Sequence, residues 1–193
     1  MKRIGIFVLT LLLLIYPLCI YVGLNHFSLH YIALFILAIS LTRFILMKKS
    51  LSTQTIRPYF FIALAGILFS SLGALFNNLL IIKLYPVMIS LILLSSFYYS
   101  LLYPPTIITR IAQSLEKTPL PAVIVIYTRK VTIVWCVFFI INATFSLYTA
   151  AYSSTAAWSL YNGLLSYLFM GLLFAGEWVI RYFVKKRIVR VAP

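Results

Sequence analysis

The sequence predicts an all-α membrane protein, a polytopic bundle of six transmembrane helices with one short interfacial helix. Three observations predict this fold class. Hydrophobic residues make up 64% of the 193 residues and charged residues only 9%, whereas a water-facing surface carries several times that share of charge. Apolar blocks recur along the chain at about 20 residues, the length that crosses a bilayer as a helix. Most of the basic residues lie between these blocks or near their ends.

Six apolar blocks meet or approach the length of a membrane span. The predicted spans are residues 4–24, 29–47, 58–76, 79–103, 131–151 and 158–182. Lys2 and Arg3 resemble the start of a signal peptide, but the first block is longer than the apolar part of one, so we expect it to be retained. Residues 104–130 form a predicted cytoplasmic loop and residues 183–193 a basic cytoplasmic tail. Residues 161–163 (YNG) are expected to mark the start of the sixth helix.

The distribution of lysine and arginine predicts the orientation. When the loops are assigned alternately to two sides, 15 of the 16 basic residues fall on one side and only Lys83 on the other. Basic loops stay in the cytoplasm, so we expect an even number of spans with both termini cytoplasmic. The expected partners are the bilayer and the anionic phospholipid head groups of its cytoplasmic surface. Nucleic acid is not an expected partner, since the charge lies between membrane spans.

The loop of residues 104–130 contains a predicted amphipathic helix, bounded by prolines on both sides. Its apolar face comprises Ile107, Ile108, Ile111 and Leu115, and Arg110 lies away from that face. Such a helix lies on a membrane surface. The sequence leaves open whether it is an ordinary surface turn packed on the bundle or a helix that docks a partner.

Polar residues inside the predicted spans are the first candidates for a functional site, because each must find a partner or water. Asn142 shares a stripe at helical spacing with Trp135, Phe139, Ser146 and Thr149. Such a stripe can line a cavity, but an interhelical hydrogen bond at a packing face is the commoner use of these residues. We therefore favour packing.

Glu177 is the only acidic residue in the predicted spans. It follows Tyr161 by 16 residues, about 24 Å along a helix, which puts it near the cytoplasmic edge of the bilayer. Arg181 comes one turn later and can pair with it. We favour an interfacial ion pair over a proton relay.

The third predicted span carries small residues along one side. They are Ala63, Gly66, Ser70, Gly73 or Ala74, and Asn77. Small residues at this spacing let helices approach closely, so this side is a predicted packing face.

The side-chain inventory disfavours several enzyme classes. There is no Asp, and the two Glu residues are far apart in sequence, whereas metal-dependent phosphoryl chemistry needs clustered carboxylates. A Ser-His-Asp hydrolase would lack its acid. His26 and His30 are four residues apart but have no third ligand. No metal site and no cofactor are predicted.

Five stretches in the second half of the chain carry a family resemblance. They are residues 83–87 (KLYPV), 104–112 (PPTIITRIA), 129–139 (RKVTIVWCVFF), 158–163 (WSLYNG) and 176–178 (GEW). The chain resembles a family of uncharacterised bacterial inner-membrane proteins, often encoded beside acyltransferases and ketoacyl synthases of aryl-polyene-type lipid pathways. More distantly, it is similar to the intracellular septation protein A family, inner-membrane proteins tied to cell-envelope maintenance. The resemblance covers residues 80–182 and implies a location and a pathway, without supplying a catalytic residue.

Three functions follow as expectations. The first is a non-enzymatic inner-membrane protein that supports cell-envelope or membrane-lipid assembly, with docking of cytoplasmic enzymes as one mode. The second is a small transporter or flippase for a lipid-linked or acyl substrate. The third is a membrane-embedded acyl-transfer enzyme. The missing catalytic groups and the basic cytoplasmic face favour the first.

Overall fold

The computed structural model describes residues 53–116 and 118–191, together with residues 21–23, 31, 34, 35, 37, 38, 41 and 42. The rest of the predicted spans over residues 4–24 and 29–47, with His26 and His30, lies outside the described residues. Within the described part the chain forms helices and no strand. This confirms the all-α class.

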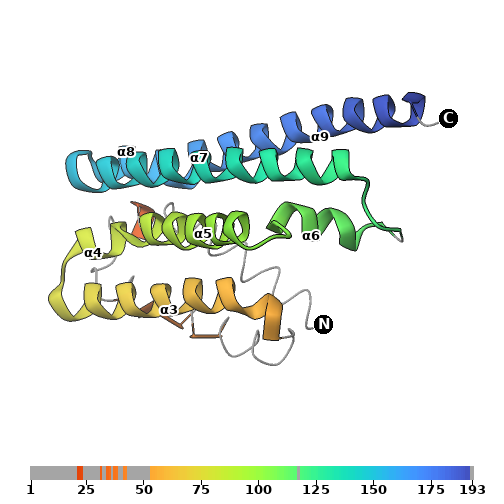
Figure 1. Cartoon of the computed structure of the whole chain (residues 1–193). Coiled ribbons are helices and arrows are strands. Elements are labelled where there is room, and N and C mark those ends of the chain that lie inside the picture. The colour runs from red at the N-terminus through yellow and green to blue at the C-terminus, as the bar shows by residue number, and fades with distance from the viewer. Residues whose placement is uncertain are drawn as a thin grey trace.

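The long helices alternate in direction along the bundle (Figure 1). In chain order they are α3 (Thr53–Phe76), α4 (Leu79–Lys83), α5 (Tyr85–Leu102), α6 (Ile107–Ser114), α7 (Ala122–Tyr152), α8 (Thr155–Leu160), the π-helix η1 (Tyr161–Leu165) and α9 (Ser166–Val191). Helix α5 lies between α3 and α7, and α9 runs along α7 and diverges from it toward the C-terminus (Figure 1). We call the end of the bundle that holds α4 and α8 the α8 end, and the opposite end, with α6 and the first turns of α7, the α6 end.

Three helical stretches among the described residues are long and apolar enough to cross a membrane. They are Leu79–Leu102, Ala122–Tyr152 and Thr155–Val184. Helix α3, where the third span is predicted, contains a shorter apolar stretch, Leu64–Gly73. A membrane-embedded protein is therefore supported, while the count of six spans stays a prediction.

The fourth predicted span, residues 79–103, is divided into α4 and α5 at Leu84. Pro86 stands in the first turn of α5. Because proline has no N–H, it cannot make the helical bond to the carbonyl four residues earlier. Helix α4 ends there, and Asn78 caps its start by accepting a hydrogen bond from Leu80 N at 2.9 Å.

The helix of the fifth predicted span begins earlier than residue 131. Helix α7 starts at Ala122, directly after Pro121, inside the segment assigned to the loop of residues 104–130. No helix breaker follows Pro121, so the helix continues. Its 31 residues extend about 46 Å at 1.5 Å per residue, which exceeds the roughly 30 Å of hydrocarbon in a bilayer. Helix α7 is therefore longer than a perpendicular crossing requires.

The predicted helix start at residues 161–163 is wrong. The last long helix begins at Thr155, where the Ser154 hydroxyl accepts a hydrogen bond from Ala157 N at 3.2 Å. Residues 161–163 lie inside the continuous helix, in the π-helix η1. A π-helix is rare and inserts one extra residue into a turn, which a search for helix ends does not reveal.

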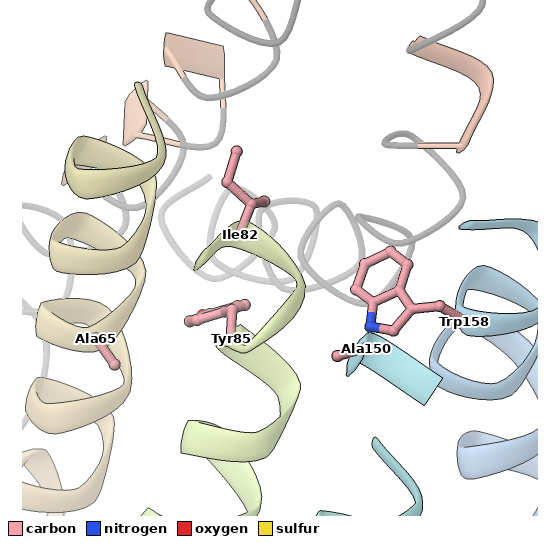
Figure 2. Close-up of a cluster of buried hydrophobic side chains, with 5 residues drawn as sticks. All are labelled: Ala65, Ile82, Tyr85, Ala150 and Trp158. Atoms are coloured by element: carbon pink, nitrogen blue, oxygen red, sulfur yellow. The ribbon is translucent and has the colours of Figure 1, made fainter. Parts of the chain in front are cut away.

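Two buried apolar clusters hold the helices together. The first, at the α8 end, comprises Ala65 on α3, Ile82 on α4, Tyr85 on α5, Ala150 on α7 and Trp158 on α8 (Figure 2). The Tyr85 ring points toward α3, and the Trp158 indole reaches from α8 toward the break between α4 and α5 (Figure 2). The second cluster comprises Ile108, Val131, Trp135 and Phe139 and joins α6 to α7.

The predicted packing face of the third span is present at Gly66, Ser70 and Gly73, which are buried. A Cβ atom on Gly73 would overlap with Cγ1 of Ile82, so only glycine permits this approach. Asn77, expected on the same face, is exposed and ends α3 with a positive φ of 47°, a conformation that asparagine tolerates at a helix end.

Candidate functional site

The buried face of α7 organises the polar groups of the bundle. Its members repeat at alternating intervals of four and three residues, the spacing of a coiled-coil seam. They are Thr128, Thr132, Trp135, Phe139, Asn142, Ser146 and Thr149. The seam therefore extends the five-residue stripe seen in the sequence by two threonines toward the α6 end.

Asn142 bonds to both neighbouring helices. Its Nδ2 donates to Ser90 Oγ on α5 at 3.0 Å, and the Tyr161 hydroxyl on η1 donates to Asn142 Oδ1 at 3.2 Å. These are the interhelical hydrogen bonds favoured for Asn142 on sequence grounds. The amide is buried, and both its nitrogen and its oxygen have a protein partner.

Asn162 makes a second amide cluster one turn nearer the α8 end. The Ser146 hydroxyl donates to Asn162 Oδ1 at 2.7 Å, and Asn162 Nδ2 donates to Thr149 Oγ1 at 3.3 Å. The same nitrogen donates to the Trp158 carbonyl at 3.0 Å. Because η1 adds a residue to the turn, Tyr161 and Asn162 both bond to side chains of α7. The π-helix thus lets two adjacent polar residues, Tyr161 and Asn162, both bond to the buried face of α7.

Lys83 and Trp158 join α4 to α8. Trp158 is fully buried, and its Nε1 donates to the Lys83 carbonyl at 3.2 Å. The Lys83 ammonium lies 5.9 Å from the centre of the indole ring, within the range of a cation–π interaction. Lys83 itself is only 6% exposed. The one basic residue predicted on the outer side is therefore enclosed by protein.

Aromatic rings fill the seam between its two polar parts. Phe97 on α5 lies 5.2 Å from Phe139 and 6.2 Å from Trp135, measured between ring centroids. Trp135 and Phe139 lie 5.7 Å apart, and Phe174 on α9 is 4.6 Å from Trp135. Apolar rings at these distances are in direct contact. They separate Asn142 from the threonines at the α6 end.

Four buried threonines join α6 to α7. Thr109 Oγ1 lies 2.8 Å from Thr106 Oγ1 and 2.7 Å from Thr128 Oγ1. The Thr132 hydroxyl donates to Thr106 Oγ1 at 3.0 Å. Each hydroxyl carries one proton, and Thr128 can give its own to the Val125 carbonyl at 2.9 Å. The other three hydroxyls then donate in one direction around the cluster, so all four are satisfied.

Glu177 and Arg181 form the ion pair favoured on sequence grounds. Arg181 Nε and Nη2 both lie 2.8 Å from Glu177 Oε1. The Tyr127 hydroxyl of α7 lies 3.2 Å from the same oxygen. This group links α7 to α9 at the α6 end, where the two helices otherwise diverge (Figure 1).

The predicted interfacial helix is α6, and only part of its apolar face is buried against α7. Ile108 is buried and Ile107 half-buried, whereas Ile111 and Leu115 are 51% and 72% exposed. Arg110 Nε donates to the Pro105 carbonyl at 2.9 Å. Helix α6 begins at Ile107, because Thr106 caps it by accepting a hydrogen bond from Thr109 N, and Leu115 follows its last residue as the C-cap.

Several residues of this network are missed by sequence reasoning. They are Ser90, Tyr161, Asn162 and the four threonines. Thr128 and Thr132 continue the 4-3 spacing of the stripe that contains Asn142. This spacing could have predicted that both threonines face the bundle. Ser90 and Asn162 belong to other helices, and their positions depend on the break at Pro86 and on η1.

Metal-ligating side chains are scattered in the described part of the chain. There, His, Cys, Asp and Glu residues do not come together in groups of three or more. Comparison with protein-family models, curated proteins and solved structures finds no match for the chain.

Proposed function

We propose that the chain is a six-span bacterial inner-membrane protein with both termini in the cytoplasm. In this proposal it supports cell-envelope or membrane-lipid assembly without catalysing a reaction, by docking cytoplasmic enzymes at the α6 end. The observation that carries the proposal is the use of the intramembrane polar groups. Asn142 and Asn162 bond to neighbouring helices, as expected for a scaffold.

The charge distribution between the two ends supports this orientation. Arg110 on α6, Arg129 and Lys130 in the first turns of α7, and Arg181 near the end of the apolar part of α9 all belong to the α6 end. Lys83 belongs to the α8 end and is buried. Basic residues gather on the cytoplasmic side of membrane proteins. The α6 end is therefore the proposed cytoplasmic face.

Helix α6 is the proposed docking element. Thr109 and Ile108 attach it to α7, while Arg110, Ile111 and Leu115 remain exposed. An amphipathic helix that keeps apolar residues exposed beside a cation suits both the head-group layer and a partner protein. The resemblance of residues 80–182 to proteins encoded beside acyltransferases points to enzymes of lipid synthesis as the partners.

Transport of an acyl or lipid-linked substrate is the alternative, and the described contacts argue against it. In the transport hypothesis, the substrate path would run past Asn142 and the amide would line a cavity. Here Asn142 is bonded on both sides, and the rings of Phe97, Trp135 and Phe139 close the seam toward the α6 end. An acyl-transfer enzyme would need a catalytic group, and Glu177 is paired with Arg181.

Site-specific photocrosslinking in living cells tests the docking role. A photoreactive amino acid is placed at Ile111 of α6 or at Leu115, its C-cap residue, and the crosslinked proteins are identified by mass spectrometry. The matched control carries the same residue at Tyr152, which is exposed at the α8 end. We expect enzymes of envelope or lipid synthesis to crosslink from α6 and not from residue 152.

Two results would contradict this proposal. Recovery of the same proteins from both positions would mean that α6 has no specific partner. Recovery of no envelope or lipid enzyme, combined with a lipid-transport defect in vesicles from a deletion strain, would favour the transporter. Uniform expression of the three variants is checked by immunoblotting, so that a negative result cannot be a loss of protein.

A further inference from the structure

Lys83 is a buried cation that lacks a counter-ion among the described residues. It is the last residue of α4 and is only 6% exposed. In the described part of the chain its ammonium makes no hydrogen bond or ion pair, and it lies 5.9 Å from the centre of the Trp158 ring. An aromatic ring stabilises a cation but carries no net charge to balance it. A buried ammonium without a counter-ion is costly, so this one requires an anion.

The acidic side chains of the chain are too far away to supply that anion. The sequence contains no Asp and only two Glu residues, Glu116 and Glu177. Glu116 follows α6, and Glu177 contacts Tyr127 near the start of α7, so both belong to the α6 end. Tyr127 and Ala150, which is in the apolar cluster of the α8 end, are about 35 Å apart along α7. Helix α9 also ends, at Val191, toward the α6 end (Figure 1). The anion therefore comes from outside the chain.

The depth of Lys83 in the bilayer points to a phosphate. The apolar stretch Leu79–Leu102 begins four residues before Lys83, about 6 Å along a helix. A lysine side chain is long enough to bring its ammonium back to the edge of the hydrocarbon, where the phosphates of phospholipids lie. The anion that the bilayer itself presents at this depth is therefore a phosphate.

The protein surface beside Lys83 is open to lipid. Leu80 lies three residues before Lys83 on α4, so their side chains are neighbours on the helix, and Leu80 is exposed. Ala157, which directly precedes Trp158 on α8, is exposed as well. Acyl chains can lie against Leu80 while the phosphate meets the ammonium.

The charge of the site favours an anionic phospholipid over a zwitterionic one. Lys83 offers one positive charge, and both glutamates are at the opposite end of the bundle. Phosphatidylglycerol carries a phosphate and an uncharged head alcohol, so its charge balances that of Lys83. Phosphatidylethanolamine and phosphatidylcholine add a second cation, which would meet Lys83 without a carboxylate to neutralise it.

We propose that the α8 end binds the phosphate of an anionic phospholipid through the Lys83 ammonium, while the Trp158 indole lies against the same cation. The proposal requires that the α8 end lies at a membrane surface, but it does not require the docking of enzymes at α6. A soluble phosphodiester shares this chemistry, and the exposed Leu80 beside the site favours the lipid as the source.

Lipid retention by the purified full-length protein tests the site. The protein is extracted in mild detergent and offered equal amounts of dioleoyl phosphatidylglycerol, phosphatidylethanolamine and phosphatidylcholine, and bound lipid is measured by native mass spectrometry. We expect phosphatidylglycerol to be retained about tenfold better than either zwitterionic lipid.

A first pair of variants separates Lys83 from the other cations. Lys83→Met removes the charge but keeps a long, flexible side chain, and it should lower phosphatidylglycerol retention to that of phosphatidylethanolamine. Lys130→Met removes an exposed cation at the α6 end and should leave the preference unchanged. Gel filtration of both variants checks that the protein stays monodisperse.

A second pair keeps Lys83 and supplies an internal counter-ion instead. Leu80→Glu places a carboxylate beside the ammonium on the exposed side of α4 and should abolish the preference for phosphatidylglycerol. Tyr152→Glu adds the same charge at an exposed position at the end of α7 and should preserve it. This pair tests the site even where Lys83→Met does not fold.

Each remaining outcome overturns a defined part of the proposal. Equal retention of the three lipids, or an unchanged preference in Lys83→Met or Leu80→Glu, would show that Lys83 does not bind the phosphate. Displacement of the lipid by an equal concentration of soluble glycerophosphoglycerol would assign the site to a soluble phosphodiester and overturn the lipid assignment. A failed lipid test together with specific crosslinks from α6 would leave the docking role intact, so the two proposals fail independently.

Discussion

The two ends of the α7 seam use polar side chains in different ways. At the α8 end, the amides of Asn142 and Asn162 bond α7 to α5 and to η1, which belong to long helices. At the α6 end, the hydroxyls of Thr109 and Thr128 bond α7 to α6, a helix of eight residues. Each amide supplies two donors and an acceptor, whereas a hydroxyl has one proton.

This difference indicates that contacts at the α8 end stabilise the bundle, whereas the α6 end carries the exposed helix α6. Loss of a contact at the α8 end separates membrane-spanning helices, so it destabilises the whole fold. Loss of a contact at the α6 end releases one short helix and can leave the bundle intact. The same contrast appears in the charges of the described residues, since Lys83 is enclosed at the α8 end and Arg110, Arg129 and Lys130 are exposed at the α6 end.

The largest expected effect is that of Trp158→Ala at the α8 end. The substitution removes a fully buried indole and its hydrogen bond to the Lys83 carbonyl, and we expect a loss of about 3 kcal/mol or more. The measurement is the temperature at which half of the detergent-solubilised protein stays monodisperse in gel filtration. Trp178→Ala is the control, because Trp178 is 70% exposed on α9. Equal shifts of this temperature in the two variants would contradict the stabilising role of the buried Trp158.

Asn162→Leu is expected to destabilise the bundle by about 1–2 kcal/mol, the range for interhelical hydrogen bonds in membranes. Leucine preserves most of the volume but leaves the Ser146 hydroxyl and the Trp158 carbonyl without the amide partner. The same heating assay measures the loss. The control is Thr144→Val, since Thr144 is exposed and bonds only within its own helix to Ile140. A variant as stable as wild type would mean that the hydrogen bonds of Asn162 to α7 do not stabilise the bundle.

Thr109→Val at the α6 end should cost about 1 kcal/mol and act locally. Valine has nearly the shape of threonine but cannot bond to Thr128 Oγ1. We expect faster amide hydrogen exchange in α6 with no change in α5 or α7. Ser114→Ala is the control, because the Ser114 hydroxyl bonds within its own helix to Ile111. A drop in global stability as large as that of Asn162→Leu would contradict the difference between the two ends.

The smallest effect is expected for Glu177→Gln. The ion pair with Arg181 is partly exposed, with the arginine side chain at 31%, so its contribution is below about 1 kcal/mol. Heating assays at low and high salt should show a small salt-dependent difference for wild type that disappears in the variant. A large, salt-independent loss would mean that the carboxylate contributes more than its ion pair with Arg181 and its contact with the Tyr127 hydroxyl.

The sequence predicted the class of the fold and the polar residues that face along α7. The 4-3 spacing of Asn142, Ser146 and Thr149 and the one-turn spacing of Glu177 and Arg181 were sufficient for those contacts, because both are local properties of one helix. Partners on other helices were not predictable in this way. Ser90 depends on how α5 starts at Pro86, and Asn162 depends on the extra residue of η1.

The start of α7 shows a second limit. Hydropathy placed the span at residue 131 because Arg129 and Lys130 interrupt the apolar run, but a helix continues through charged residues when it leaves the membrane. Ala122 begins the helix since Pro121 is the nearest breaker. Charged residues therefore predict the limit of an apolar span, here residue 131, whereas proline predicts the limit of the helix, here Ala122. The two positions differ by nine residues.

The central claim is that the α7 seam is a closed packing surface, and cysteine labelling in sealed membrane vesicles tests it most directly. Single cysteines replace Phe139, Asn142 and Ser146 in a background of Cys19→Ala and Cys136→Ala, and a membrane-impermeant maleimide is added from either side. Cysteines at Arg129 and Tyr152, which are exposed at opposite ends of α7, report that each side is accessible. We expect the two end positions to label from opposite sides and the three seam positions to stay unlabelled. Labelling at residues 139 and 142 would reveal a water-filled path and contradict the account.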